Sequence, residues 1–190
     1  MGFYKEHYIE VMNEIIEENR NALSVVDSEI VERFVEDLLK ADQVYFVGVG
    51  RVLLSLQAFC KRLAHLGIKV HYVGEITEPA ITSKDLLVVG SGSGNSIFPV
   101  AIAKKAKQIG ATVIHIGSNP HGDVSEISDY MVRIPVRTKY YLNDEISSNQ
   151  PMTSLFEQSL LIFGDTISKM IVDERKLDMK ELWKYHANLE

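Results

Sequence analysis

Five short apolar runs alternate with helical segments, and this alternation constrains the fold more than any other feature of the sequence. Each run is nearly continuous in apolar residues, as in strands that are covered on both faces, and does not alternate apolar with polar. The runs occupy residues 43–47, 69–73, 85–89, 112–116 and 130–134. We therefore expect an α/β fold, a three-layer sandwich in which a five-stranded parallel sheet lies between helices.

Further helices are expected at both ends of the chain. Two precede the first strand, with Asp27 as the N-cap of the second; a long helix covers about residues 155–172, and a short one covers 179–190. Residues 136–150 have no period and are expected to form a long loop. The 190 residues are long enough for one domain, with an N-terminal helical arm over about 1–41 and a C-terminal tail over about 173–190.

Composition excludes several classes of function. A net charge of -6 offers no basic surface for nucleic acid, and no apolar run approaches the ~20 residues that span a membrane. The N-terminus does not have the basic and then apolar pattern of a secretory signal, so we expect a cytoplasmic protein. Cys60 is the one cysteine and lies in an apolar helical pattern, which indicates core packing. No metal site emerges from the spacing of the histidines.

A serine- and glycine-rich turn after the third strand is the strongest functional signal. Its glycines allow backbone N–H groups to converge, its hydroxyls add donors, and the next helix contributes its positive N-terminus. The turn lies where ligands bind in open parallel sheets, beyond the carboxyl ends of the strands. We expect a phosphate site formed by Ser91, Gly92, Ser93, Gly94, Asn95 and Ser96. A solvated connection without a ligand is the alternative.

The turn after the first strand, Gly48-Val49-Gly50-Arg51, lies at the same edge of the sheet. A dinucleotide fingerprint requires glycine where Leu53 stands, and no P-loop lysine follows either turn, so nucleotide binding is not indicated. Arg51 begins a helix there and is a candidate contact for an anion or a sugar hydroxyl. A surface arginine without such a role is the alternative.

Two titratable residues near the C-terminus are candidates for chemistry. Glu157 lies one turn into the long helix and is a candidate base. The Ser154-x-x-Glu157 spacing also fits a capping box, which would explain the carboxylate by helix capping alone. His186 is polar and is not readily explained as a core residue, and a solvated terminal histidine is its alternative interpretation.

Taken together, these segments resemble a sugar isomerase (SIS) domain, and most closely the 6-phospho-3-hexuloisomerases. The resemblance covers nearly the whole chain. It is carried by Gly48-Val49-Gly50-Arg51, the serine-rich loop, the segment Pro151-Met152-Thr153-Ser154-Leu155-Phe156-Glu157, and the ending His186-Ala187-Asn188-Leu189-Glu190. The loop alone indicates only an SIS domain, and the last two segments narrow the resemblance.

The resemblance implies a flavodoxin-like sheet and an isomerase without metal or organic cofactor. Such enzymes interconvert 3-hexulose 6-phosphate and fructose 6-phosphate in formaldehyde fixation by the ribulose monophosphate route. Carried over, the serine-rich loop and Gly50 bind the substrate phosphate, and Glu157 is the base. Arg51 and His186 are candidates for the electrophilic or ring-opening role. The resemblance also implies a homodimer or homotetramer with shared active sites, and it leaves two alternatives for His186, which acts either in its own subunit or in a neighbouring one.

One departure from the family pattern leaves the substrate open. Family members usually continue Gly-x-Gly-Arg with a serine that contacts the ligand, and this chain has Val52. The lost hydrogen bond is worth about 0.5–1.5 kcal/mol. The alternatives are another sugar-phosphate isomerase, of the aldose–ketose type, and an SIS protein that binds sugar phosphate without catalysis.

Overall fold

The structure, a computed structural model, describes residues 2–189. Its elements follow one another as α1 (Phe3–Ser24), α2 (Ser28–Lys40), β1 (Val44–Val47), α3 (Gly50–His65), β2 (Val70–Tyr72), β3 (Leu86–Gly90), α4 (Ile97–Ile109), β4 (Thr112–Gly117), α5 (Asp123–Ile127), β5 (Tyr130–Arg133), α6 (Ser154–Glu174) and the 3-10 helix η1 (Glu181–Tyr185).

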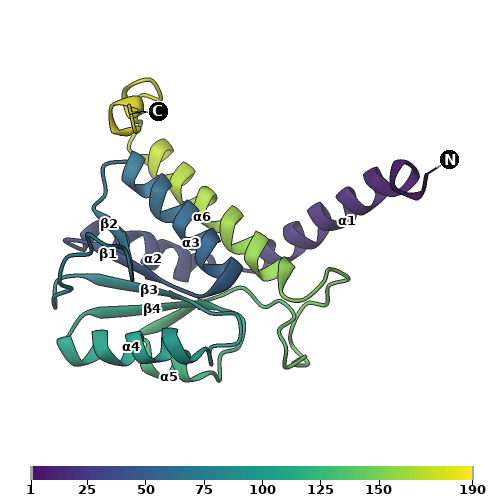
Figure 1. Ribbon diagram of the computed structural model, residues 1–190, viewed down its shortest axis with the longest axis horizontal. Helices are drawn as coiled ribbons and strands as arrows, with labels where there is room; N and C mark the ends of the chain where they lie inside the picture. The colour runs from purple at the N-terminus through teal and green to yellow at the C-terminus, as the bar shows by residue number, and fades with distance from the viewer. Residues whose placement is uncertain (1, 190) are drawn as a thin grey trace.

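The five strands form one parallel sheet in the order β2-β1-β3-β4-β5. The expected α/β class and the five-stranded parallel sheet are confirmed, with helices on both faces (Figure 1). From β1 the chain moves to β2 on one side, and from β3 it moves to β4 and β5 on the other. The connections after β1 and β3 therefore diverge at a topological switch point, where ligands of such sheets bind.

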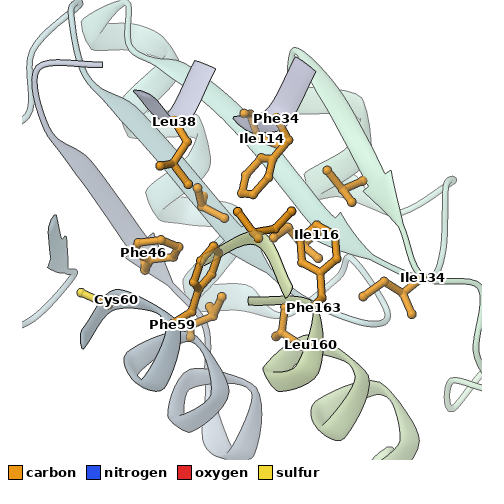
Figure 2. Close-up of a cluster of buried hydrophobic side chains, with 14 of the residues drawn as sticks. Phe34, Leu38, Phe46, Phe59, Cys60, Ile114, Ile116, Ile134, Leu160 and Phe163 are labelled. Atoms are coloured by element: carbon orange, nitrogen blue, oxygen red, sulfur yellow. The ribbon is translucent and has the colours of Figure 1, made fainter. Parts of the chain in front are cut away.

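Each face of the sheet is covered by its own set of helices. Side chains alternate along the strands, so that Phe46 packs toward α2, α3 and α6, whereas Tyr45 and Val47 belong to the cluster under α4 and α5. Figure 2 shows the first cluster, where the rings of Phe34, Phe59 and Phe163 lie among Ile114 and Ile116. Both faces are covered, which is why the strands are apolar throughout.

Local signals define several helix ends. The side chain of Asp27 accepts hydrogen bonds from the amides of Glu29 and Ile30, at 2.9 and 3.4 Å, which confirms the expected N-cap of α2. Gly110 ends α4 with a φ of 95°, and this left-handed backbone favours glycine. Cys60 is buried in the core, as expected, and burial raises the pKa of its thiol to about 12.

The C-terminal tail differs from the expectation. The helix expected over 179–190 is only η1 (Glu181–Tyr185), and Glu190 lies outside the described residues. Leu182 packs against the core, and the ring of Tyr185 lies beside Gly67 at the end of α3. So short a segment cannot meet the cost of nucleating an α-helix, and docking holds it in the tighter 3-10 form.

Candidate functional site

The serine-rich loop, residues 91–96, leaves β3 at the switch point and leads into α4. Its carbonyl groups are occupied by neighbouring loops, because the Gly92 carbonyl accepts from the amides of Ser118 and Asn119, and the Gly94 carbonyl accepts from that of Val124. Within residues 2–189, no acceptor is found for the amides of Ser93, Ser96, Ile97 and Phe98. The loop and the first turn of α4 thus present unused N–H donors, as an anion requires.

The side chains of this loop differ in the hydrogen bonds that they make. Ser91 is buried and its hydroxyl accepts from the Gly94 amide at 3.1 Å. The Asn95 carboxamide accepts from the amide of Asp123 and donates to the Tyr140 hydroxyl, which ties it to two other segments. Ser96 precedes α4 and makes no side-chain cap hydrogen bond. Ser96 is therefore better placed than Asn95 to offer its side chain to a ligand.

His115, from β4, supports the serine-rich loop from beneath. Its Nε2 lies 2.8 Å from the Ser91 carbonyl, and because a carbonyl only accepts, Nε2 carries the proton. Its Nδ1 lies 2.8 Å from the Ser125 hydroxyl. Burial lowers the pKa of His115 to about 4, although the hydrogen bond to Ser91 opposes this. The histidine is thus a neutral, buried support of the loop, a role that sequence analysis missed.

Arg51 and Glu157 are brought together across the interface of α3 and α6. The Arg51 Nε donates to Glu157 Oε2, and the Thr153 hydroxyl donates to Oε1 at 2.8 Å. The Glu157 side chain is 10% exposed and that of Arg51 is 63% exposed. The Ser55 hydroxyl donates to the Glu157 carbonyl at 2.7 Å and joins the two helices at this point. Each carboxylate oxygen retains further lone pairs for a ligand.

The capping-box explanation of Glu157 is wrong. Helix α6 begins at Ser154 with Thr153 as the N-cap residue, and the Ser154 hydroxyl donates to the Pro151 carbonyl at 2.8 Å. Glu157 lies four residues after the N-cap, where its side chain meets the Thr153 hydroxyl and the Arg51 guanidinium. The four-residue spacing of Thr153 and Glu157 was the available sequence signal for this contact.

A pocket of about 210 Å³ adjoins the pair, lined by Arg51, Leu54, Ser55, Ala58, Glu157, Gln158 and Leu161. None of the serine-rich loop lines it. The two regions approach each other through Phe156, since a Cβ on Gly92 would lie 3.3 Å from its ring. Val52, at the position of the family's serine, packs toward Gly48 and Gly90 and contacts the core.

The structure does not bring His186 to Glu157 within one chain. His186 lies at the other end of α3 and α6, in a pocket of about 460 Å³ that His65, Ser168 and Trp183 also line. The His186 and His65 rings stack with centroids 5.2 Å apart. Burial and the charges of Lys61 and Arg62 lower the pKa of His65. Glu157 lies eleven residues before Ser168, about 16 Å along α6.

The expected long loop, residues 136–150, lies between β5 and α6 and is held by two carboxylates. Glu145 accepts from the Thr138 amide and hydroxyl, at 3.0 and 2.7 Å, and from the Leu142 amide at 3.0 Å. Glu18, from α1, accepts from Ser148, Asn149 and Gln150 at the other end of the loop. No period in the sequence pointed to these two anchors.

Residues 2–189 contain neither a membrane-spanning helix nor a cluster of metal-ligating side chains. No helix is both long and apolar enough to cross a membrane. No group of three or more His, Cys, Asp or Glu side chains lies close enough together to hold a metal ion.

Comparisons with known proteins agree with this architecture. The SIS domain family matches residues 37–162. A 3-hexulose-6-phosphate isomerase of Bacillus subtilis is 34% identical over 95% of this chain and 98% of its own length. One of Mycobacterium gastri is 36% identical over 87% of this chain and 82% of its own.

A solved structure is similar over nearly the whole fold. The crystal structure of a Methanococcus jannaschii protein, described as inferring a molecular function of 3-hexulose-6-phosphate isomerase, superposes with a TM-score of 0.82 at 31% identity. It covers 95% of this chain and 99% of its own. The match to residues 37–162 spans well over half of the chain, and the Bacillus subtilis relative matches almost end to end. On these grounds the chain belongs to the SIS domain family.

Proposed function

We propose that this protein is an isomerase that interconverts 3-hexulose 6-phosphate and fructose 6-phosphate. The observation that carries the proposal is the Glu157 carboxylate, largely buried at the start of α6 and oriented by Thr153 and Arg51. The free amides of the serine-rich loop supply a place for the phosphate. Relatives at 34 and 36% identity carry the name of this activity, which supports the same assignment here.

The chemistry requires one base and a stabilised oxyanion. The proton on C2 of the 3-ketose is acidic because the C3 carbonyl takes up the negative charge. Glu157 removes this proton, a cis-enediol forms, and Glu157 returns the proton to C3, while a hydroxyl proton moves from O2 to O3. The substrate- and phosphate-binding part of the proposed site consists of Gly50, Ser91, Gly92, Ser93, Gly94, Asn95 and Ser96. This is a proton transfer without net oxidation, and we propose that it needs no cofactor.

Arg51 is proposed to stabilise the oxyanion. Its guanidinium already donates to Glu157, and its largely exposed side chain has donors left over for a substrate oxygen. As negative charge moves from the carboxylate to the enediolate, the guanidinium can follow it by a small rotation. A fixed positive charge at this place lowers the barrier because the charge develops beside it.

We propose that a second copy of the chain completes the site and contributes His186. The pocket beside Glu157 measures about 210 Å³, below the ~300 Å³ at which small-molecule sites usually begin. Helix α1 projects from the sheet (Figure 1) and exposes the apolar side chains of Phe3, Tyr4, Tyr8, Ile9, Val11 and Ile16. A contiguous exposed apolar stripe is typical of a surface that another protein covers. A dimer or tetramer would bury it.

Mixing two inactive variants tests the shared site. Glu157→Gln and His186→Gln homo-oligomers are each expected to be inactive, and subunit exchange between them is expected to restore turnover in sites that combine both intact residues. Sedimentation measures the oligomeric state beforehand. A monomer, or hybrids that never regain activity, would contradict the shared site.

We propose that the enzyme acts in the ribulose monophosphate route of formaldehyde fixation, in the cytoplasm, where free sugar phosphates occur. We propose that its partners are the sugar phosphate and further copies of the chain, without nucleic acid or a membrane. This metabolic setting rests on the names of the relatives.

Proton NMR in heavy water tests the reaction itself. Fructose 6-phosphate is expected to acquire deuterium at C3 and to form a 3-hexulose product. Deuterium at C1 together with an aldose would show aldose–ketose chemistry, and binding without exchange would show a sugar-phosphate sensor; either result refutes the proposed activity. Glu157→Gln is expected to lose exchange and to keep binding, whereas Glu174→Gln, exposed at the end of the same helix, is the matched control.

A further inference from the structure

Helix α1 contacts the chain both before and after the proposed base Glu157. Its N-terminal part projects away, and its C-terminal part lies against α6 and the long loop (Figure 1). Glu14, Glu18 and Asn19 of α1 make polar contacts with this region, and the Glu14 carboxylate accepts from the Asn149 side chain at 2.6 Å. Glu18 binds the loop before Glu157, and Asn19 binds the residues after it.

The Glu18 carboxylate accepts three hydrogen bonds from consecutive residues of the loop. The Ser148 hydroxyl donates to Oε2 at 2.6 Å, the Asn149 amide donates to Oε1 at 2.8 Å, and the Gln150 carboxamide donates to Oε2 at 2.8 Å. Burial raises the pKa of Glu18, but these three donors and the charge of Arg137 outweigh it and lower the pKa overall. The carboxylate is therefore charged, and its hydrogen bonds are of the stronger kind.

A short path connects this clamp to the base. Gln150 is buried and is followed by a tight turn in which the Pro151 carbonyl accepts from the amide and hydroxyl of Ser154. The turn sets the position of Thr153, whose hydroxyl donates to Glu157 Oε1 at 2.8 Å. Fixing the chain at Gln150 thus fixes the donor that orients one oxygen of the base.

Asn19 holds the other side of the same segment. Its carboxamide donates to Gln158 Oε1 at 2.9 Å and accepts from the Ser159 hydroxyl at 3.0 Å. Glu157 therefore lies between two segments that α1 holds through adjacent residues. Neither Glu18 nor Asn19 lines the pocket beside Glu157, although Gln158, which Asn19 contacts, does. Neither residue of α1 has a hydrogen bond to the serine-rich loop within residues 2–189.

We propose that Glu18 is a positioning residue for the base Glu157, acting through Gln150 and Thr153. This inference rests on the proposed function of Glu157. Glu18 does not reach the substrate. It holds the preceding loop in the one arrangement in which Thr153 donates to the carboxylate, so its effect belongs to the chemical step and not to phosphate binding.

Glu18→Gln tests the inference because it keeps the shape of the side chain. A single neutral amide oxygen replaces two charged ones, so the three donors cannot all be satisfied. We expect kcat for fructose 6-phosphate to fall at least about tenfold, since small misplacements of a catalytic group are costly, while KM stays within about twofold. The Asn149 amide is expected to exchange faster with heavy water, a readout that does not depend on activity.

Glu17→Gln is the matched control, because Glu17 precedes Glu18 on α1 and pairs with Arg20 on the surface, at 3.6 Å. It is expected to leave kcat, KM and the exchange of the loop unchanged. An unchanged kcat in Glu18→Gln overturns the inference. Equal losses in kcat and in phosphate binding, with a general fall in Tm, indicate a merely structural role and overturn it as well.

The same assay separates this inference from the proposed function. If Glu157→Gln retains turnover, Glu157 is not the base and the proposed function of the residue fails. If Glu157→Gln is inactive and Glu18→Gln matches the wild type, only the positioning role of Glu18 fails.

Discussion

Replacing His115 by glutamine is expected to remove a large part of the acid sensitivity of folding. His115 is fully buried in β4, and burial lowers its pKa from 6.5 to about 4. Between pH 6.5 and about pH 4, His115 therefore binds a proton in the unfolded chain but not in the folded chain. The stability that the neutral ring contributes is complete above the unfolded pKa and is lost as the pH falls toward the folded one.

The magnitude follows from linkage. One pKa unit corresponds to about 1.36 kcal/mol, and between about pH 7.5 and about pH 5.0 the titration of His115 alone lowers the free energy of unfolding by about 2 kcal/mol. In His115→Gln a side-chain amide takes over the donation to the Ser91 carbonyl, and the titrating ring is gone. Over this pH range the free energy of unfolding of the variant is expected to fall by about 2 kcal/mol less than that of the wild type.

Urea unfolding at the two pH values measures the difference, and only the change with pH is compared. A constant offset in stability between the two proteins therefore does not affect the result. His7→Gln is the control for the loss of a histidine as such, since His7 is exposed on α1. Parallel losses in His115→Gln and in the wild type would refute the assignment of a buried, neutral His115.

Further expectations concern local packing and capping. Asp27→Ala removes the side-chain acceptor for two amides of α2 and is expected to cost about 1 kcal/mol in urea unfolding. Gly164→Ala adds a Cβ that would lie 2.6 Å from the ring of Phe59, so it is expected to destabilise by about 1–3 kcal/mol, although alanine is the better helix former; a gain in Tm would contradict this packing. Phe34→Ala empties a fully buried position of the core and is expected to cost about 3–5 kcal/mol.

The fold was predictable because its signals are local. Continuous apolar runs identify strands covered on both faces, and Asp27 and Gly110 mark helix ends by their own chemistry. The serine-rich loop could be placed at the ligand edge because the carboxyl ends of parallel strands share one edge. The tail was mispredicted, since so short a segment takes its form from docking against α3.

The interactions of the site were not predictable, because they join distant parts of the chain. Arg51 and Glu157 are 106 residues apart, and Glu18 and Gln150 are 132 apart. No period or motif links either pair. The sequence offered the capping box as a local explanation of Glu157, and it failed because the helix begins one residue earlier than that motif requires. The role of His186 depends on a second copy of the chain and stays a prediction.

Apolar packing stabilises the sheet of this molecule, and polar contacts stabilise its loops. The sheet is held by two apolar clusters, whereas the loops at its ligand edge carry backbone groups that must find partners. His115 holds the serine-rich loop, Glu145 folds one part of the long loop onto itself, and Glu18 fixes the other. Substitutions in the two apolar clusters should therefore act mainly on the free energy of unfolding. Substitutions of these three anchors should first make the loops less ordered. The loss of order should then change the geometry around Glu157 and the serine-rich loop.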